Sequence, residues 1–169
     1  MKKFLPVFAV IDMKHCDITL KDGGTESIII KVGEGTFSFT ETRNQEYRMN
    51  RGLLNTVREG DEAPVEWSLD IEWDSIQGSP GSPVSGGIDI IRGIIYGGEG
   101  YVSSDTDDPC ASYAFDILAE YRPPCDAGAQ DISLPHCRIE SCAYDMQAGT
   151  LQLSGKANVT QATITASGS

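Results

Sequence analysis

The sequence predicts a mainly β protein, a sandwich or barrel with one short flanking α-helix. The first observation is strict alternation from Val65 to Asp74, where apolar or aromatic residues alternate with polar ones. Successive side chains of a strand point to opposite faces, so this pattern is typical of a strand with one buried face. The second observation is that similar short segments recur between turn signals. A single segment has helical spacing instead.

Length and charge limit the function classes. The 169 residues predict a single domain spanning residues 1–169, with enough material for a core. The chain has 13 basic and 25 acidic residues, a net charge of −12. Phosphate binding needs a basic surface, so the balance argues against an ordinary nucleic-acid binder. It is compatible with a protein that DNA must pass without sticking.

The N-terminal segment Phe4 to Ile11 is apolar and follows Lys2 and Lys3, which mimics a secretory start. It is short, contains Pro6 and lacks a small-residue cleavage site, so we expect a first strand instead. No apolar run reaches membrane-spanning length, and we expect no membrane partner. The five cysteines are an odd number, which favours reduced thiols.

The next segments predict a hairpin. Residues 16–21 and 27–32 both alternate, and Asp22-Gly23-Gly24 between them is a turn signal. Ile132 to Pro135 is expected to be a short edge piece, because proline is excluded from central ladders. The tail from Gln161 to Ser169 is expected to be loosely ordered. Further strands are predicted over residues 36–40, 46–50, 113–122, 138–144 and 151–160.

Three other segments are not predicted as strands. Arg51 to Pro64 is expected to be a loop, because it is dense in Arg, Glu, Asp and Gly. Residues 76–87 are rich in Gly, Ser and Pro and predict an irregular loop. Ile88 to Tyr96 predicts the helix, because Ile88, Ile91 and Ile95 recur at helical spacing and Gly97-Gly98 can end it.

The sequence contains no recognisable catalytic motif, and we expect no enzymatic activity and no cofactor. Asp105, Asp107 and Asp108 lack the spaced ligands of a calcium loop, which favours a solvated turn. A zinc site has no CxxC spacing to support it, so we expect no metal. The residues considered for zinc are His136, Cys137 and Cys142, with Cys110 or Cys125.

The polar face of the central strand carries a row of carboxylates. Like charges repel one another and add nothing to a core, so a simple interpretation is a solvated face or a protected sheet edge. Trp67 and Trp73 lie on the opposite face and are expected in the core. The carboxylates of the row are Glu66, Asp70, Glu72 and Asp74.

Several motifs occur in one order between about residue 10 and residue 160. They are Gly33-Glu34-Gly35, Thr42 to Tyr47, Arg51-Gly52, Val57 to Pro64, Ser104-Asp105, Asp107 to Cys110 ahead of Tyr113, and Leu153 to Val159. As an ordered set they resemble the tail tube proteins of tailed bacteriophages. The chain departs from that pattern at Ala157, where a cysteine is frequent, and at His136-Cys137, which weakens any shared cysteine-based metal site.

The resemblance implies a structural protein of the phage tail, assembled in the host cytoplasm. Copies would form rings, usually of six, that stack into a hollow tube with an inner β-barrel shared between subunits. Genomic DNA would pass through it transiently and non-specifically. Further partners would be other tail proteins, namely the terminator, the tape measure, the baseplate or tip and, in a contractile tail, a sheath.

The resemblance implies a role for two groups of residues. Glu66, Asp70, Glu72 and Asp74 would line the lumen, where an acidic wall repels phosphates, and residues 36–50 would form the neighbouring strand. Charged residues around the predicted loop would contact the next subunit or ring. These interface residues are Arg43, Arg51, Arg58, Glu59, Asp61 and Glu62.

Two alternatives stay open. A tube protein of a contractile injection or secretion system would share fold and assembly but carry no DNA. A monomeric carbohydrate-binding or adhesive β-sandwich would need an aromatic surface patch.

Overall fold

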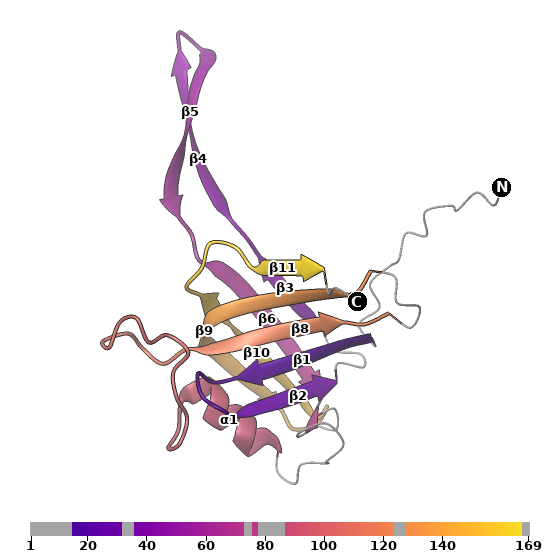
Figure 1. Cartoon of the computed structure of the whole chain (residues 1–169). Helices are drawn as coiled ribbons and strands as arrows, with labels where there is room; N and C mark the ends of the chain where they lie inside the picture. Colours follow the sequence, from indigo (N-terminus) through magenta and orange to yellow (C-terminus); the bar gives the residue numbers. More distant parts are fainter. Residues whose placement is uncertain (1–14, 32–35, 73–75, 78–86, 124–127, 167–169) are drawn as a thin grey trace, which may run out of the picture.

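The computed structural model describes residues 15–31, 36–72, 76–77, 87–123 and 128–166 (Figure 1). It is mainly β with one short helix, which confirms the predicted fold class. The helix is α1 (Gly87–Tyr96), and the strands are β1 (Cys16–Lys21), β2 (Ser27–Lys31), β3 (Phe37–Thr40), β4 (Arg43–Asn50), β5 (Leu53–Glu62), β6 (Val65–Glu72), β7 (Ile76–Gln77), β8 (Phe115–Tyr121), β9 (Gln130–Asp145), β10 (Thr150–Ala157) and β11 (Thr163–Ala166).

The body is one antiparallel sheet folded over on itself. Its strand order is β3-β6-β10-β9-β8-β1-β2-β7, with β11 on the N-terminal part of β9. We call β3, β6, β10 and the C-terminal half of β9 the front sheet, and the N-terminal half of β9 with β8, β1, β2 and β7 the back sheet. The sheet does not close into a barrel: among the described strands, β3 and β7 end its order.

The long strand β9 belongs to both sheets. Gln130 to Leu134 pair with β8, whereas Cys137 to Asp145 pair with β10. The register with β8 shifts between the two parts, and Pro135 and His136 lie at that irregularity, where His136 has a φ of 56°. A bulge tolerates proline because the ladder is interrupted there. The prediction of a short edge piece ending at Pro135 was therefore wrong.

The core lies between the two sheets. Val65, Trp67, Leu69 and Ile71 of β6 are buried, so the alternation of this strand is confirmed over its described residues. The Trp67 and Phe115 rings meet edge to face across the sandwich, with centroids 5.7 Å apart. Trp73 lies outside the described residues.

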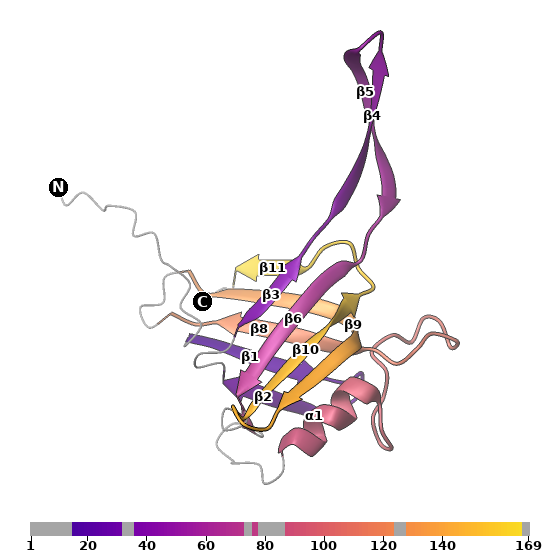
Figure 2. The ribbon, with the colours of Figure 1, turned by 180° about the vertical axis from the view of Figure 1, so that it is seen from behind.

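Helix α1 packs at the end of the body opposite to the hairpin described below (Figures 1 and 2). Ile91, Ile94 and Ile95 are buried, which explains why so short a helix is stable. It ends at Gly97, whose φ is 73° and whose N–H donates to the carbonyl of Gly93 at 2.9 Å. The predicted helix and its stop signal are confirmed.

Strands β4 and β5 form a two-stranded hairpin, the arm, that projects away from the body (Figures 1 and 2). The prediction of a loop from Arg51 to Pro64 was wrong. The turn residues Arg51 and Gly52 both have positive φ, 51° and 80°, the conformation of a tight hairpin turn. Two register shifts between the strands break the alternation that would have marked β5 in the sequence.

The segment from Thr163 to Ala166 forms β11 and pairs with β9, so this part of the tail is not loosely ordered as predicted. The β1–β2 hairpin is confirmed. The buried Asp22 carboxylate accepts the N–H groups of Gly24, Glu26 and Val102 at 2.9 to 3.1 Å, which ties this turn to a distant loop. The predicted N-terminal strand lies outside the described residues. No helix that the structure describes is long and apolar enough to cross a membrane.

Gly155 tests how tightly the front sheet packs at the bend of β9. A methyl group there would collide with the carbonyl oxygen of Arg138 and lie 3.0 Å from the Trp67 ring. We expect Gly155→Ala to lower the free energy of unfolding by about 1–3 kcal/mol, the usual effect of overpacking. Urea unfolding of dilute protein would measure it.

The matched control is Gly24→Ala, whose methyl would meet its neighbours at an ordinary 3.4 to 3.5 Å. Equal stability of both variants would show that the packing around Gly155 is loose.

Candidate functional site

The outer face of the front sheet carries the predicted carboxylates. Glu66 is exposed, and Asp70 and Glu72 are half-buried, all on the face of β6 opposite to the core. Asp74 lies outside the described residues. The sequence predicted residues 36–50 as the strand next to β6. Of these, Phe37–Thr40 form β3 and pair with β6, whereas residues 43–50 belong to the arm.

Polar contacts cross this face between neighbouring strands. The Thr36 hydroxyl donates to Asp70 Oδ2 at 3.0 Å, and the Ser38 and Ser68 hydroxyls lie 2.7 Å apart. Lys156 Nζ of β10 lies 3.9 Å from Glu66 Oε1. The face is therefore acidic and hydroxyl-rich, with one lysine beside one of its carboxylates.

The front sheet is open at both of its edges. Within the described part of the chain, no strand pairs with the outer edge of β3 or with the outer edge of residues 138–145 of β9. Unpaired strand edges present free N–H and C=O groups, which readily pair with another strand. The acidic face thus lies on a sheet that can be extended on both sides.

The six predicted interface residues all lie on the arm, spread along its length. Arg43 and Glu62 are register partners at its base, and Arg51 lies at its turn. Arg58 Nε and Glu46 Oε2 are 2.6 Å apart, but both side chains are more than half exposed, so the pair adds little stability. The structure places Glu59 and Asp61 in β5, between Arg58 and the base.

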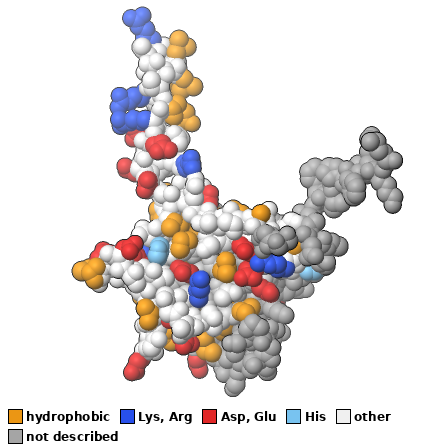
Figure 3. All heavy atoms as spheres, viewed as in Figure 1, with side chains coloured by type: hydrophobic (Ala, Val, Ile, Leu, Met, Phe, Trp, Pro, Cys, Tyr) orange, Lys and Arg blue, Asp and Glu red, His pale blue; other side chains and the backbone are white. Residues whose placement is uncertain are grey.

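The sequence reasoning missed the apolar residues of the arm. Figure 3 shows hydrophobic side chains along one side of the arm and basic side chains along the other. The signal was the Tyr47 and Met49 alternation, which predicted a strand but not its exposure. The exposed members are Tyr47, Met49, Leu53, Leu54 and Val57.

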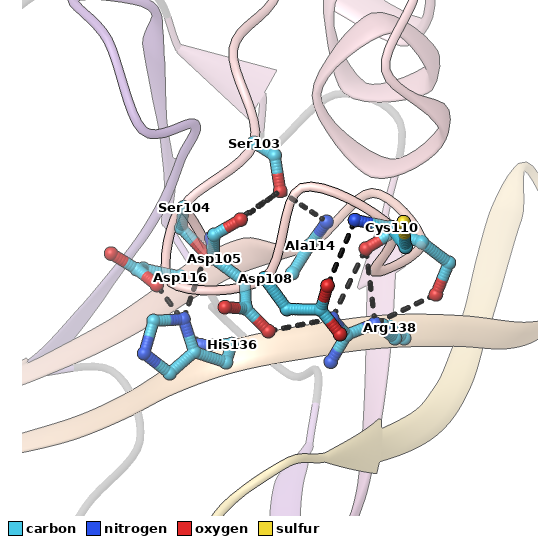
Figure 4. A network of polar contacts seen from close by, with 10 residues as sticks. Ser103, Ser104, Asp105, Asp108, Cys110, Ala114, Asp116, His136 and Arg138 are labelled. Atoms are coloured by element: carbon cyan, nitrogen blue, oxygen red, sulfur yellow. Dashed lines mark hydrogen bonds and ion pairs between the residues drawn. The ribbon is translucent and has the colours of Figure 1, made fainter.

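A second polar cluster surrounds the bend of β9 (Figure 4). Arg138 Nη2 lies 2.8 Å from Asp105 Oδ2, and Arg138 Nε donates to the Ser112 hydroxyl at 2.8 Å. The backbone N–H of His136 donates to Asp116 Oδ1 at 3.1 Å. The cluster fastens the loop before β8 to β9, and Arg138 compensates the charge of Asp105.

The zinc candidates do not converge. Cys137 is buried, its thiol donates to the carbonyl of Leu134, and burial raises its pKa. Cys110 is exposed and Cys142 is half-buried, whereas Cys125 lies outside the described residues. In the part of the chain that the structure describes, no three His, Cys, Asp or Glu residues are grouped to hold a metal ion.

The Asp105–Arg138 contact has a predictable pH dependence. The hydrogen bond from Arg138 lowers the pKa of Asp105 below its ordinary value of 3.8. A carboxyl with a depressed folded-state pKa stabilises the fold above its unfolded pKa, and this contribution disappears as the pH falls through the folded-state pKa. We expect Asp105→Asn to lower the thermal midpoint at neutral pH, with the difference from wild type shrinking below about pH 4.

Asp107→Asn, in the same loop but exposed, is the control. A midpoint difference for Asp105→Asn that stays constant from neutral to acidic pH would contradict the ion-pair explanation.

Solved structures match nearly the whole chain, and two of them show what this fold resembles. One is described as an extracellular contractile injection system, the PVC sheath–tube complex in its extended state, with a TM-score of 0.52, 12% identity and coverage of 95% of each chain. The other is the anti-feeding prophage cap, a tube-terminating cap, with a TM-score of 0.51, 12% identity and coverage of 98% of this chain and 97% of that one. No family model and no curated protein matches the sequence. At this identity the likeness shows a shared fold, which extends over both chains almost from end to end.

Proposed function

We propose that this chain is a structural subunit of a tail-like tube, in which copies form rings that stack into a hollow filament. The observation that carries the proposal is the front sheet, which has an acidic outer face and, among the strands that the structure describes, two open edges. The likeness to a sheath–tube component over 95% of both chains supports the same role. The role is structural rather than catalytic.

The edges of the front sheet suit a ring of identical copies. Its four strands alternate in direction, so β3 of one copy can pair antiparallel with residues 138–145 of the next without breaking the pattern. The N–H of Asp70 donates to the carbonyl of Thr36, so the N–H groups of Phe37 and Phe39 point to the open edge. Head-to-tail contacts of this kind close into a ring when the rotation permits. Six copies is the number that the resemblance to tail tube proteins implies.

In such a ring the outer face of the front sheet becomes the wall of the bore. Glu66, Asp70 and Glu72 then face the lumen, with Asp74 expected to follow them, and Lys156 offsets one charge. An acidic wall repels a polyanion and lets it slide. The cargo that fits this chemistry is DNA, which favours a phage virion tail, with the terminator, tape measure and baseplate or tip proteins as further partners.

A second candidate has its own support. One matching structure is the sheath–tube complex of an extracellular contractile injection system and the other is a tube-terminating cap, so a tube that delivers another cargo inside a sheath fits the same fold. Both candidates predict the same rings and differ in what passes through them. In both, we propose that Arg43, Arg51, Arg58, Glu59, Asp61 and Glu62 of the arm contact a neighbouring copy.

Assembly is the first test. We expect purified protein at high concentration and neutral pH to form rings or hollow rods, because open edges of the same chain complement each other. Negative-stain electron microscopy and sedimentation velocity would detect them. A uniform monomer at every concentration would support the adhesive β-sandwich instead.

The lumen charge is the second test. We expect the variant Glu66→Gln, Asp70→Asn, Glu72→Gln to assemble normally, because it preserves side-chain shape and changes only the face of β6 opposite to the core. In electron micrographs, small cationic gold particles should line the bore of wild-type rods and be absent from the variant's bore. The control is Asp107→Asn, which removes an exposed carboxylate from the loop between α1 and β8. The opposite result would be gold that binds the outer surface of wild-type rods and of the control but not of the triple variant. That result would place these carboxylates on the outside of the tube.

A further inference from the structure

The arm has two chemically different faces, which the strand register defines. Tyr47 pairs with Val57 and Met49 with Leu54, so these four side chains lie on one face of the hairpin. Glu46 pairs with Arg58 and Arg48 with Thr56 on the opposite face. The arm is therefore a small amphipathic sheet with one apolar face and one mainly polar face, on which Leu53, the register partner of Asn50, is the apolar exception.

The apolar face has no cover within the described residues. Tyr47, Met49, Leu54 and Val57 are 63%, 68%, 69% and 55% exposed. The side-chain hydrogen bond between Arg58 and Glu46 stays inside the arm and does not fasten it to the body. A two-stranded hairpin is marginally stable alone in water, and a contiguous exposed apolar patch marks an interaction surface. The arm thus gains most from a partner that covers this face.

Charge identifies the partner. The outer part of the arm, Gln45 to Arg58, contains three arginines and one glutamate, a net charge of +2, whereas the whole chain carries −12. The remainder of each chain is therefore strongly acidic. The arm also continues directly from β3 and β6, and the outer edge of β3 belongs to the proposed interface. The basic, apolar outer part of the arm is complementary to the body of another copy.

We propose that the apolar face of the arm, Tyr47, Met49, Leu54 and Val57, is buried against a second copy of this chain, and that this burial rather than the arm's charges supplies most of the stability of the contact. This inference rests on the proposed function, because the second copy is a neighbour in the assembly. The arginines then orient the approach: Arg58 is already paired with Glu46, which leaves Arg48 and Arg51 for the acidic partner.

Salt separates the two contributions. At about 1 M salt the screening length falls to roughly 3 Å, so contacts between exposed charges weaken. Apolar burial does not depend on these charges and persists. A contact held by the apolar face therefore survives high salt, whereas a contact held by the arginines dissociates.

The test uses shape-preserving variants of the two faces. Met49→Gln with Val57→Thr removes apolar character, and Arg48→Gln on the opposite face is the matched control. We expect the first variant to raise the concentration needed for assembly at least about tenfold, equivalent to about 1.4 kcal/mol, at both low and high salt. We expect the control to raise it less than about threefold, and only at low salt. Sedimentation velocity measures assembly, and thermal unfolding verifies that the body stays folded.

The outcomes separate this inference from the tube itself. Hollow rods that form at the wild-type concentration in Met49→Gln, Val57→Thr but not in Arg48→Gln would overturn the inference and leave the proposed function intact. A photo-crosslinking residue in place of Leu54 provides an independent measurement. Crosslinks between two copies support the inference even when no rods form. In that case only the proposed tube would be overturned. Crosslinks confined to one chain, or obtained only with anionic lipid vesicles, would overturn the arm's assignment to a second copy.

Discussion

The bend in β9 is the constraint on which the architecture depends. One strand pairs with β8 in its first part and with β10 in its second, so the two sheets share it and enclose the core between them. The register shift at Pro135 and His136 permits the change of direction, and the contact of Gly155 with the Arg138 backbone brings β10 tightly against the bend. Without the bend, the inner face of β6, with Trp67 against Phe115, would have no opposite sheet.

Among the described strands, the front sheet has one free edge at β3, another at the part of β9 beyond the bend, and a polar outer face. A soluble monomer usually protects such edges with charges, bulges or a covering loop. Here the only covering helix, among the residues that the structure describes, packs at the far end of the body. A sheet whose core face is satisfied and whose edges are not is stabilised by a neighbour that continues the ladder. In the ring that we propose, the acidic outer face would become a continuous surface across copies, which one chain cannot form alone.

Local patterns made part of this structure predictable. Period-two alternation identified β6 and its carboxylate face, Asp22-Gly23-Gly24 identified the first hairpin, and the isoleucine spacing identified α1. The arm and the full length of β9 were not predictable in this way. Arg51-Gly52 adopts a hairpin turn without the usual Asn-Gly signal, register shifts hide β5, and Pro135 suggests an edge although it lies at a bulge. The charged interface candidates all lie on the arm, but their placement along it depends on a register that only the three-dimensional pairing fixes, and their contact with a neighbour stays a prediction.

The arm and two strands of the front sheet, β3 and β6, belong to one long hairpin, because β3 leads into β4 and β5 returns into β6. Contact at the arm and the position of β6 are therefore connected through the backbone. The basic outer part of the arm and the acidic body also make the subunit polar, with unlike surfaces at its two ends. Contacts between unlike surfaces repeat head to tail, and where no rotation closes them they continue as a filament. In the tube that we propose, edge pairing of the front sheets would close a ring and docking of the arms would add a second kind of contact between copies, and both would require only the one chain.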